Sequence, residues 1–204
     1  MQKINSLIVI IFCCLLLTAC QVIKQKNLAN SKQILHWYKH QHEVQKIYKY
    51  QASGSFVYVS NQQRVYAHFF LQQSTPDRYH LLLISSLYNT IIDLNVMPGI
   101  VQLNDYRGKR YFSDSVNKMI QNITGIRIPL QHLHTWILGI PSDANNVTLD
   151  DQYRVKQFTY NKDDCSWHVQ YLKYNSNTKP AVPSQLEVTQ NDEHINLKID
   201  YWKI

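Results

Sequence analysis

The side chains of this sequence that could act in catalysis are not spaced as in the common catalytic motifs. The chain has no G-x-S-x-G turn, no glycine-rich phosphate or dinucleotide loop, no H-E-x-x-H and no C-x-x-C pair. Its acidic pairs, Asp150-Asp151 and Asp163-Asp164, stand at turn positions, where carboxylates usually bond the local backbone. No second partner is placed to complete an acid–base pair, so we expect no catalytic residues and no enzyme.

Histidines offer the one spacing that suggests a metal ion. His36, His40 and His42 include an i, i+4 pair, and His132 and His134 form a second, weaker group. Histidines on the polar side of amphipathic helices are usually solvated. We therefore expect no metal site and no cofactor.

The N-terminus carries a chemical signal of a different kind. Lys3 precedes an unbroken apolar run of eleven residues, Leu7 to Leu17, which is too short for the ~20 residues that span a bilayer. The run ends in Leu17-Thr18-Ala19-Cys20, the lipobox pattern of small residues before a cysteine that is acylated. We expect residues 1–19 to be a cleaved signal peptide and Cys20 to carry lipid; the alternative is an ordinary signal peptide with a chance cysteine.

Lipidation of Cys20 decides where the protein resides and what stabilises it. Cys165 would then have no intramolecular partner, so stability has to come from a packed core and not from disulfides. Two or three acyl chains, at ~0.8 kcal/mol per buried methylene, make the anchoring close to irreversible. Gln21 stands where an Asp usually retains bacterial lipoproteins at the inner membrane, which indicates the outer membrane. Residues 20–30 are predicted to be the acylated Cys and a short tether.

The remaining chain, residues 31–204, reads as one β-rich domain. A composition of 45% hydrophobic and 17% charged residues with only five glycines excludes collagen-like, low-complexity and polytopic membrane proteins. The net charge of +7 permits contact with anionic lipid or nucleic acid without deciding between them. No internal repeat or second domain is evident.

Period-two and period-3.6 patterns place the elements. A helix is predicted from Ser31 to about Tyr50, and two short amphipathic helices follow Ser113 and Pro129. Between and after them lie predicted strands around Phe56–Val59 and over 64–71, 78–84, 91–96, 100–103, 109–112, 152–160, 166–174, 186–189 and 194–202. The alternation slips phase between Val155 and Phe158, which predicts a bulge. These hairpins indicate one curved antiparallel sheet, an α+β protein, whose apolar face the two short helices cover.

Several apolar side chains share the face that those helices would cover. Four alternate along one predicted strand and three along the last, and two lie on the helix after Pro129. These are Val65, Ala67, Phe69, Leu71, Ile195, Leu197, Ile199, Trp136 and Ile137. We expect them to line a common concave surface.

Two predicted hairpin loops carry unusual side chains. Leu87 and Tyr88 stand at the crest of an otherwise polar connection, where a leucine either folds back onto its strands or protrudes as an apolar probe for a membrane. Arg107, Lys109 and Arg110 form the densest basic cluster, either a solvated hairpin tip or a contact for anionic head groups or an acidic partner.

The chain from about His36 to Ile204 resembles the LolB family. The resemblance rests on the lipobox and on separated stretches with the spacing of that family. They are Gln62 to Ala67 with Phe69-Phe70 and Gln72-Gln73, Asp77-Arg78-Tyr79 with Leu81 to Leu83, Pro129-Leu130 through Trp136 to Pro141, and Asp151 to Arg154. It implies an incomplete antiparallel barrel around a hydrophobic cavity, closed by short helices.

The same resemblance implies a function. LolB proteins accept acylated lipoproteins from the periplasmic carrier LolA and insert them into the outer membrane, and Leu87 falls on the family's protruding-loop leucine. Ser86 and Tyr88 replace the Pro and Gly that commonly flank it. The implied partners are lipoproteins, LolA and outer-membrane lipid, with no nucleic acid, and we expect a monomer. The alternatives are a structural outer-membrane lipoprotein acting as an assembly scaffold, which predicts a filled core, and a lipid-processing enzyme, which needs a buried Ser/His/Asp cluster.

Overall fold

The computed structural model describes residues 33–125, 129–162 and 165–204. The predicted signal peptide, Cys20, the tether and the Asp163-Asp164 turn lie outside these residues. The chain divides into two compact units, one up to Lys39 and one from His40 to Ile204. The first described element is a helix over residues 33–45. Within the described residues no helix is both long and apolar enough to cross a membrane.

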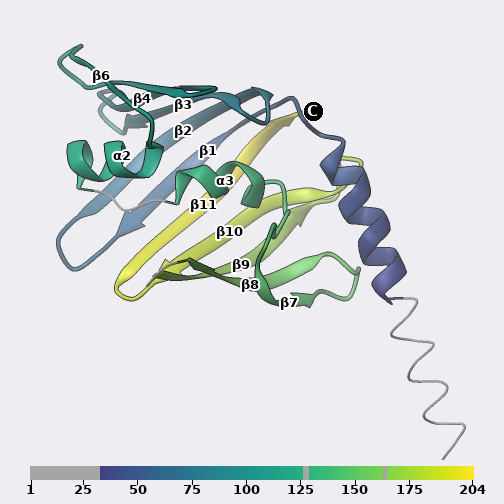
Figure 1. The fold of residues 1–204 in the computed structure, drawn as a ribbon. Helices are drawn as coiled ribbons and strands as arrows, with labels where there is room; N and C mark the ends of the chain where they lie inside the picture. The colour runs from purple at the N-terminus through teal and green to yellow at the C-terminus, as the bar shows by residue number, and fades with distance from the viewer. Residues whose placement is uncertain (1–32, 126–128, 163–164) are drawn as a thin grey trace, which may run out of the picture. The chain divides into compact units, whose positions relative to one another are not determined.

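The described residues that follow this helix form one antiparallel sheet with two helices (Figure 1). In chain order the elements are β1 (Tyr50–Val59), β2 (Arg64–Thr75), β3 (Arg78–Ser85), β4 (Thr90–Met97), β5 (Ile100–Asn104), β6 (Arg110–Ser113), α2 (Val116–Thr124), α3 (Leu130–Trp136), β7 (Asn145–Leu149), β8 (Val155–Lys162), β9 (Cys165–Asn175), β10 (Val182–Gln190) and β11 (Glu193–Lys203). The eleven strands are ordered β6-β5-β4-β3-β2-β1-β11-β10-β9-β8-β7. Every strand except β1 and β11 therefore pairs only with its neighbours in sequence.

The β1–β11 pairing joins the two halves of the sheet. Phe56 of β1 lies opposite Leu197 of β11 on one side and opposite Ala67 of β2 on the other. All three side chains are buried, so the apolar faces of β2 and β11 become one surface. The burial pattern of β2 alternates strictly from Tyr66 to Ser74, as period-two patterning requires of a sheet with one solvated face.

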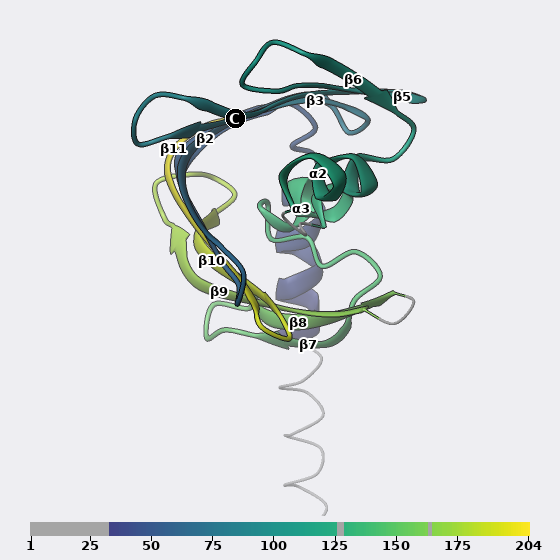
Figure 2. The ribbon, with the colours of Figure 1, turned by 90° about the vertical axis from the view of Figure 1, so that its left-hand side faces the viewer.

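The sheet curves around α2 and α3, which lie on its concave side (Figure 2). It remains open, because β6 and β7 are its two edges and do not pair with each other. α2 follows Ser115, not Ser113 as predicted; the Ser113 hydroxyl instead accepts the Ser115 N–H at 3.0 Å. Gly125 ends α2 with a φ of 71°, a left-handed conformation that glycine adopts without steric cost. The predicted class, a helix-covered incomplete barrel, is confirmed.

The structure differs from the sequence patterns at further places. The first helix ends at residue 45 and not near Tyr50, because Tyr50 is the first residue of β1 and its buried side chain packs in the core. β7 carries no alternating apolar pattern, because it is a short edge strand without a buried side chain, and the sequence did not reveal it. β10 begins at Val182, several residues before the predicted start.

The predicted bulge is present in β8. Thr148 lies opposite Gln157 and Leu149 opposite Val155, so one residue of β8, Lys156, is left without a partner in β7. Lys156 is exposed, while Val155 is fully buried. The slip in the apolar alternation between Val155 and Phe158 is thus explained by the β-bulge at Lys156.

A close backbone approach at Gly54 generates a stability prediction. A Cβ at this position would lie 1.9 Å from the Lys198 carbonyl oxygen, where the β1–β11 register shifts. Because the obstacle is backbone, Gly54→Ala should lower the free energy of unfolding by about 1–3 kcal/mol or more, measured by urea denaturation. The neighbouring Ser55→Ala should change it by less than about 0.5 kcal/mol. An equal effect of both changes would contradict the steric argument.

Candidate functional site

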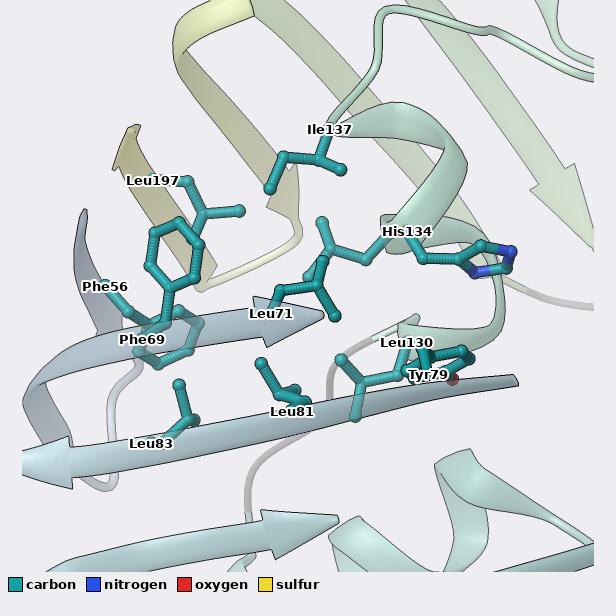
Figure 3. Close-up of a pocket in the computed structure, with 11 residues that line it drawn as sticks. Phe56, Phe69, Leu71, Tyr79, Leu81, Leu83, Leu130, His134, Ile137 and Leu197 are labelled. Carbon is teal, nitrogen blue, oxygen red and sulfur yellow. The ribbon is translucent and has the colours of Figure 1, made fainter. Parts of the chain in front are cut away.

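An apolar cavity lies between the concave face of the sheet and α3 (Figure 3). Its volume is about 30 Å³. Strands β1, β2, β3 and β11 supply one wall, and α3 with the residue after it supplies the other. The lining residues are Phe56, Phe69, Leu71, Tyr79, Leu81, Leu83, Leu130, Leu133, His134, Ile137 and Leu197.

Four of the predicted cavity residues line it, namely Phe69, Leu71, Ile137 and Leu197. The others lie around it. Trp136, Ala67, Ile195 and Ile199 are buried without lining the cavity. Val65 is half-buried and lines an open groove beside the β3–β4 loop, because it stands near the start of β2, beyond the part that α3 covers.

Sequence reasoning missed the contribution of β3. Tyr79, Leu81 and Leu83 point into the cavity, but in the sequence they lie within an apolar run whose two faces look alike. Register supplies the missing information, since Leu81 lies opposite Leu71 and Leu83 opposite Phe69. The alternation of β2 therefore identifies the inward face of β3 once the pairing is known.

Two tyrosine hydroxyls of the sheet bond carbonyl groups at the end of α3, and the Gln41 side chain bonds a carbonyl group just after it. The Tyr50 hydroxyl donates to the His134 carbonyl and the Tyr171 hydroxyl to the Trp136 carbonyl, each at 2.8 Å. The Gln41 side chain donates to the Gly139 carbonyl at 3.0 Å. The last carbonyls of a helix have no intrahelical partner, so these bonds complete α3 and orient it. Burial raises the pKa of Tyr50 and Tyr171, which keeps both hydroxyls protonated as donors.

One end of the cavity is polar but uncharged. The rings of Tyr79 and His134 stack with centroids 5.2 Å apart and planes 19° apart. Among the described residues, neither the Tyr79 hydroxyl nor the His134 Nδ1 has a hydrogen-bond partner. Burial lowers the pKa of His134 and raises that of Tyr79, so both are neutral near neutral pH. The cavity wall therefore presents no charge to a hydrocarbon ligand.

The cavity is small in this structure. By the same measure a water molecule needs about 10–15 Å³, so 30 Å³ corresponds to about two or three waters. An acyl chain needs far more room than this volume provides. The interior is therefore not packed solid, and α3 forms one wall of the space that remains.

The remaining candidates for chemistry have local partners. His40 Nε2 lies 2.9 Å from the Ala181 carbonyl oxygen, and His132 Nε2 lies 2.8 Å from the Tyr160 hydroxyl. Asp150 accepts from the backbone N–H groups of Gln152 and Arg154 and pairs with the Arg154 side chain, the role expected of a turn carboxylate. In the part of the chain that the structure describes, no three His, Cys, Asp or Glu side chains are grouped as metal ligands.

A histidine–carboxylate pair lies on the opposite face of the sheet. His80 Nε2 is 2.7 Å from Asp93 Oδ1, and the Asn104 amide donates to the other carboxylate oxygen at 2.9 Å. Burial alone would raise the pKa of Asp93, but the bonds from Asn104 and His80 outweigh it and the pKa is lowered. Both side chains are partly exposed on the face away from the cavity, and the described residues include no hydroxyl bonded to His80. This pair thus lacks the buried nucleophile of a hydrolase.

The β3–β4 loop presents its apolar residues to solvent. Leu87 is 81% exposed and Tyr88 90% exposed. Tyr88 adopts a φ of 62°, and its N–H donates to the Ser85 carbonyl at 2.9 Å, which closes a tight turn without Pro or Gly. The Ser85 hydroxyl accepts the Asn89 N–H at 3.1 Å and further fixes the loop. Leu87 therefore protrudes and does not fold back onto its strands.

Comparison with known proteins adds independent information. A family model described as outer membrane lipoprotein LolB matches residues 48–202. The outer-membrane lipoprotein LolB of Serratia proteamaculans (strain 568) is 45% identical over 203 residues, which cover 100% of this chain and 98% of that protein. LolB of Yersinia pestis (strain Pestoides F) is 45% identical over 190 residues, covering 93% and 92%.

A solved structure shares the fold. A LolA superfamily protein from Nitrosomonas europaea superimposes with a TM-score of 0.51 at 6% sequence identity, covering 76% of this chain and 86% of that one. At this identity the likeness concerns the arrangement of strands and helices alone.

The buried His134 predicts a pH dependence of stability. Its folded-state pKa lies below the ordinary 6.5 because burial disfavours the charged form. The unfolded state then binds more protons, so the stabilisation is complete above about pH 6.5 and declines as the pH falls below it. Urea titrations between about pH 7 and pH 5 should show this decline, and His134→Phe should make it shallower. His132 and His40, whose pKa values burial also lowers, should leave a residual slope.

Substitution of an exposed histidine provides the control for this pH dependence. His194→Phe should leave the pH dependence of the wild type in place, because this side chain lies at the surface. Equal slopes in the wild type and in His134→Phe would show that His134 does not contribute.

Proposed function

Because this chain belongs to the LolB family of outer-membrane lipoproteins, we propose that its α3-covered cavity receives the acyl chains of lipoproteins arriving from the carrier LolA. As a member of that family it is a non-enzymatic, periplasm-facing receptor of lipoprotein sorting. The observation that carries the proposal is the apolar cavity itself. Tyr79 and His134 are its polar lining side chains, and both are neutral.

Acyl chains enter as α3 moves away from the sheet. Each methylene removed from water contributes ~0.8 kcal/mol, so several methylenes offset the local cost of exposing Leu130, Leu133 and Ile137. α3 has seven residues, and its C-terminal carbonyls are held by side-chain hydrogen bonds that can exchange with water. No nucleotide is needed, since transfer runs downhill when each acceptor binds the chains more tightly than the donor.

The anchor and the loop have separate tasks in this proposal. The lipid on Cys20 keeps the receptor at the outer membrane, and residues 20–30 let the folded domain reach the bilayer surface. Leu87 enters the lipid while the cargo chains are still shielded. Burying one leucine contributes only about 1.5–3 kcal/mol, too little for anchoring but enough to orient the domain.

The scaffold alternative explains fewer observations. A structural lipoprotein would have a filled core and no reason to retain two unpartnered polar groups beside an unfilled cavity. It would also give no role to a leucine that is 81% exposed at a loop crest.

Leu87→Glu should separate cargo uptake from cargo delivery. The side chain is exposed, so folding and uptake from loaded LolA should remain close to the wild type. Delivery into liposomes should fall at least roughly tenfold, because a charge at the tip is penalised in lipid. Transfer from carrier to receptor and from receptor to liposomes are measured on the same variant, with Ser86→Glu as a control for charge in the loop. Equal loss in both assays would identify Leu87 as a cavity residue.

Removing the lipid anchor should leave binding intact. Cys20→Ala behind an ordinary signal peptide should give an unanchored protein that still takes lipoproteins from LolA, because the cavity lies wholly between β1 and the end of the chain. Co-purification of cargo with the variant measures this directly. Absence of cargo from a folded variant would show that the lipid takes part in binding.

A further inference from the structure

A basic hairpin stands beside the exposed leucine. The β3–β4 loop and the β5–β6 loop lie at the same end of the sheet, because β3 to β6 are consecutive antiparallel strands. The register agrees, since Asp93 near the start of β4 lies opposite Asn104 at the end of β5. An open groove of about 850 Å³ runs between the two loops and is lined by Ser85 and Asn89 on one side and by Tyr106 and Arg107 on the other.

The cations of this hairpin are held outward without an acidic partner. Arg107, Lys109 and Arg110 are all exposed. The guanidinium of Arg107 lies 5.0 Å from the centre of the Tyr106 ring, and its Nε donates to the Tyr106 hydroxyl at 2.7 Å. Among the described residues, no carboxylate forms an ion pair with these three side chains.

The carboxylate of Asp105 accepts hydrogen bonds within the hairpin. Asp105 Oδ1 accepts the backbone N–H groups of Arg107 at 2.8 Å and Lys109 at 2.9 Å. Its Oδ2 accepts the Tyr111 hydroxyl at 3.2 Å. Asp105 therefore shapes the loop and leaves the basic side chains available to an external anion.

The neighbouring side chains suit a bilayer interface. Tyr106 is 67% exposed and Tyr88 is 90% exposed, and tyrosine rings favour the boundary between head groups and hydrocarbon. Leu87, which is 81% exposed and precedes Tyr88 in the same loop, is the aliphatic residue able to enter the hydrocarbon. A flat bilayer can thus meet a leucine, two tyrosines and a basic cluster at one end of the sheet.

We propose that the two loops form one docking surface for phospholipid membranes that contain anionic head groups. Arg107 and Lys109 bind phosphate oxygens and so orient the domain with these two loops toward the bilayer. This orientation directs Leu87 into the hydrocarbon. The proposal rests on the proposed function, delivery to a bilayer, and adds the lipid class that the receptor contacts and the residues that recognise it. The attraction is electrostatic and falls off within the Debye length, about 8 Å at physiological salt, so it should weaken as salt is added.

The test reports docking without requiring cargo. The lipidated full chain, with Cys165→Ser to remove the exposed free cysteine, carries an environment-sensitive fluorophore on Ser86→Cys. It is reconstituted into vesicles of phosphatidylcholine alone or with phosphatidylglycerol. We expect a blue-shifted emission on the anionic vesicles, and added salt or Arg107→Glu with Lys109→Glu should return it to the value on neutral vesicles. Delivery of cargo to anionic liposomes should fall at least roughly tenfold in the double variant.

A matched charge change at the other end of the sheet is the control. Arg78→Glu with Lys203→Glu alters the net charge equally and lies at exposed positions away from the two loops. It should keep the blue shift. The inference is overturned if both double variants behave alike, or if Arg107→Glu with Lys109→Glu keeps the wild-type emission on anionic vesicles.

A protein partner for the basic hairpin would give a different result. In that case Arg107→Glu with Lys109→Glu would reduce uptake from loaded LolA while the blue shift remained, which also overturns the inference. Failure of the wild-type protein to take cargo at all would contradict the proposed function, whereas the emission assay would still decide whether the surface docks on lipid.

Discussion

The pairing of β1 with β11 is the contact on which the rest of the structure depends. All other strands pair with sequence neighbours, so without this ladder the chain would form two separate meanders, each with an uncovered apolar face. With it, Phe56, Ala67 and Leu197 lie side by side, and the concave surface becomes wide enough to need α2 and α3 as cover. The tight approach at Gly54 is a consequence of this ladder, since there the Lys198 carbonyl occupies the space of a side chain.

An open, curved sheet creates a particular problem of packing. A closed barrel of few strands fills its interior with its own side chains, whereas this sheet leaves its edges β6 and β7 apart and relies on short helices to fill the concavity. α3 is fixed mainly at its C-terminal end, by Tyr50, Tyr171 and Gln41. The fit beneath it is incomplete, with an apolar cavity and two polar groups that lack partners. These features cost stability, and in the proposed function they let hydrocarbon displace α3.

The cavity and the proposed docking surface are separate, and both include part of β3. The inward face of this strand supplies Tyr79, Leu81 and Leu83 to the cavity, and its C-terminal end leads directly into the loop of Leu87. A strand is stiff along its length, so the position of the loop relative to the cavity is set by the sheet. The two proposals together therefore assign uptake to the inward face of β3 and delivery to the loop at its end.

The sequence by itself determined the features that depend on local patterns. The lipobox, the period of each long strand, the bulge near Lys156 and the leucine at a loop crest are all readable because neighbours in the chain define them. Four of the cavity residues were found in the same way, from alternation in β2 and β11 and from the stripe that ends at Ile137. The hairpins between neighbouring strands were predicted, but only the tertiary structure showed that β1 pairs with β11, that Tyr79 stacks on His134 and that Val65 lies outside the cavity. It also showed the early end of the first helix and the edge strand β7. The physical reason is that these outcomes arise from pairing and packing between residues far apart in the chain, and such contacts leave no periodic trace in either partner's own sequence.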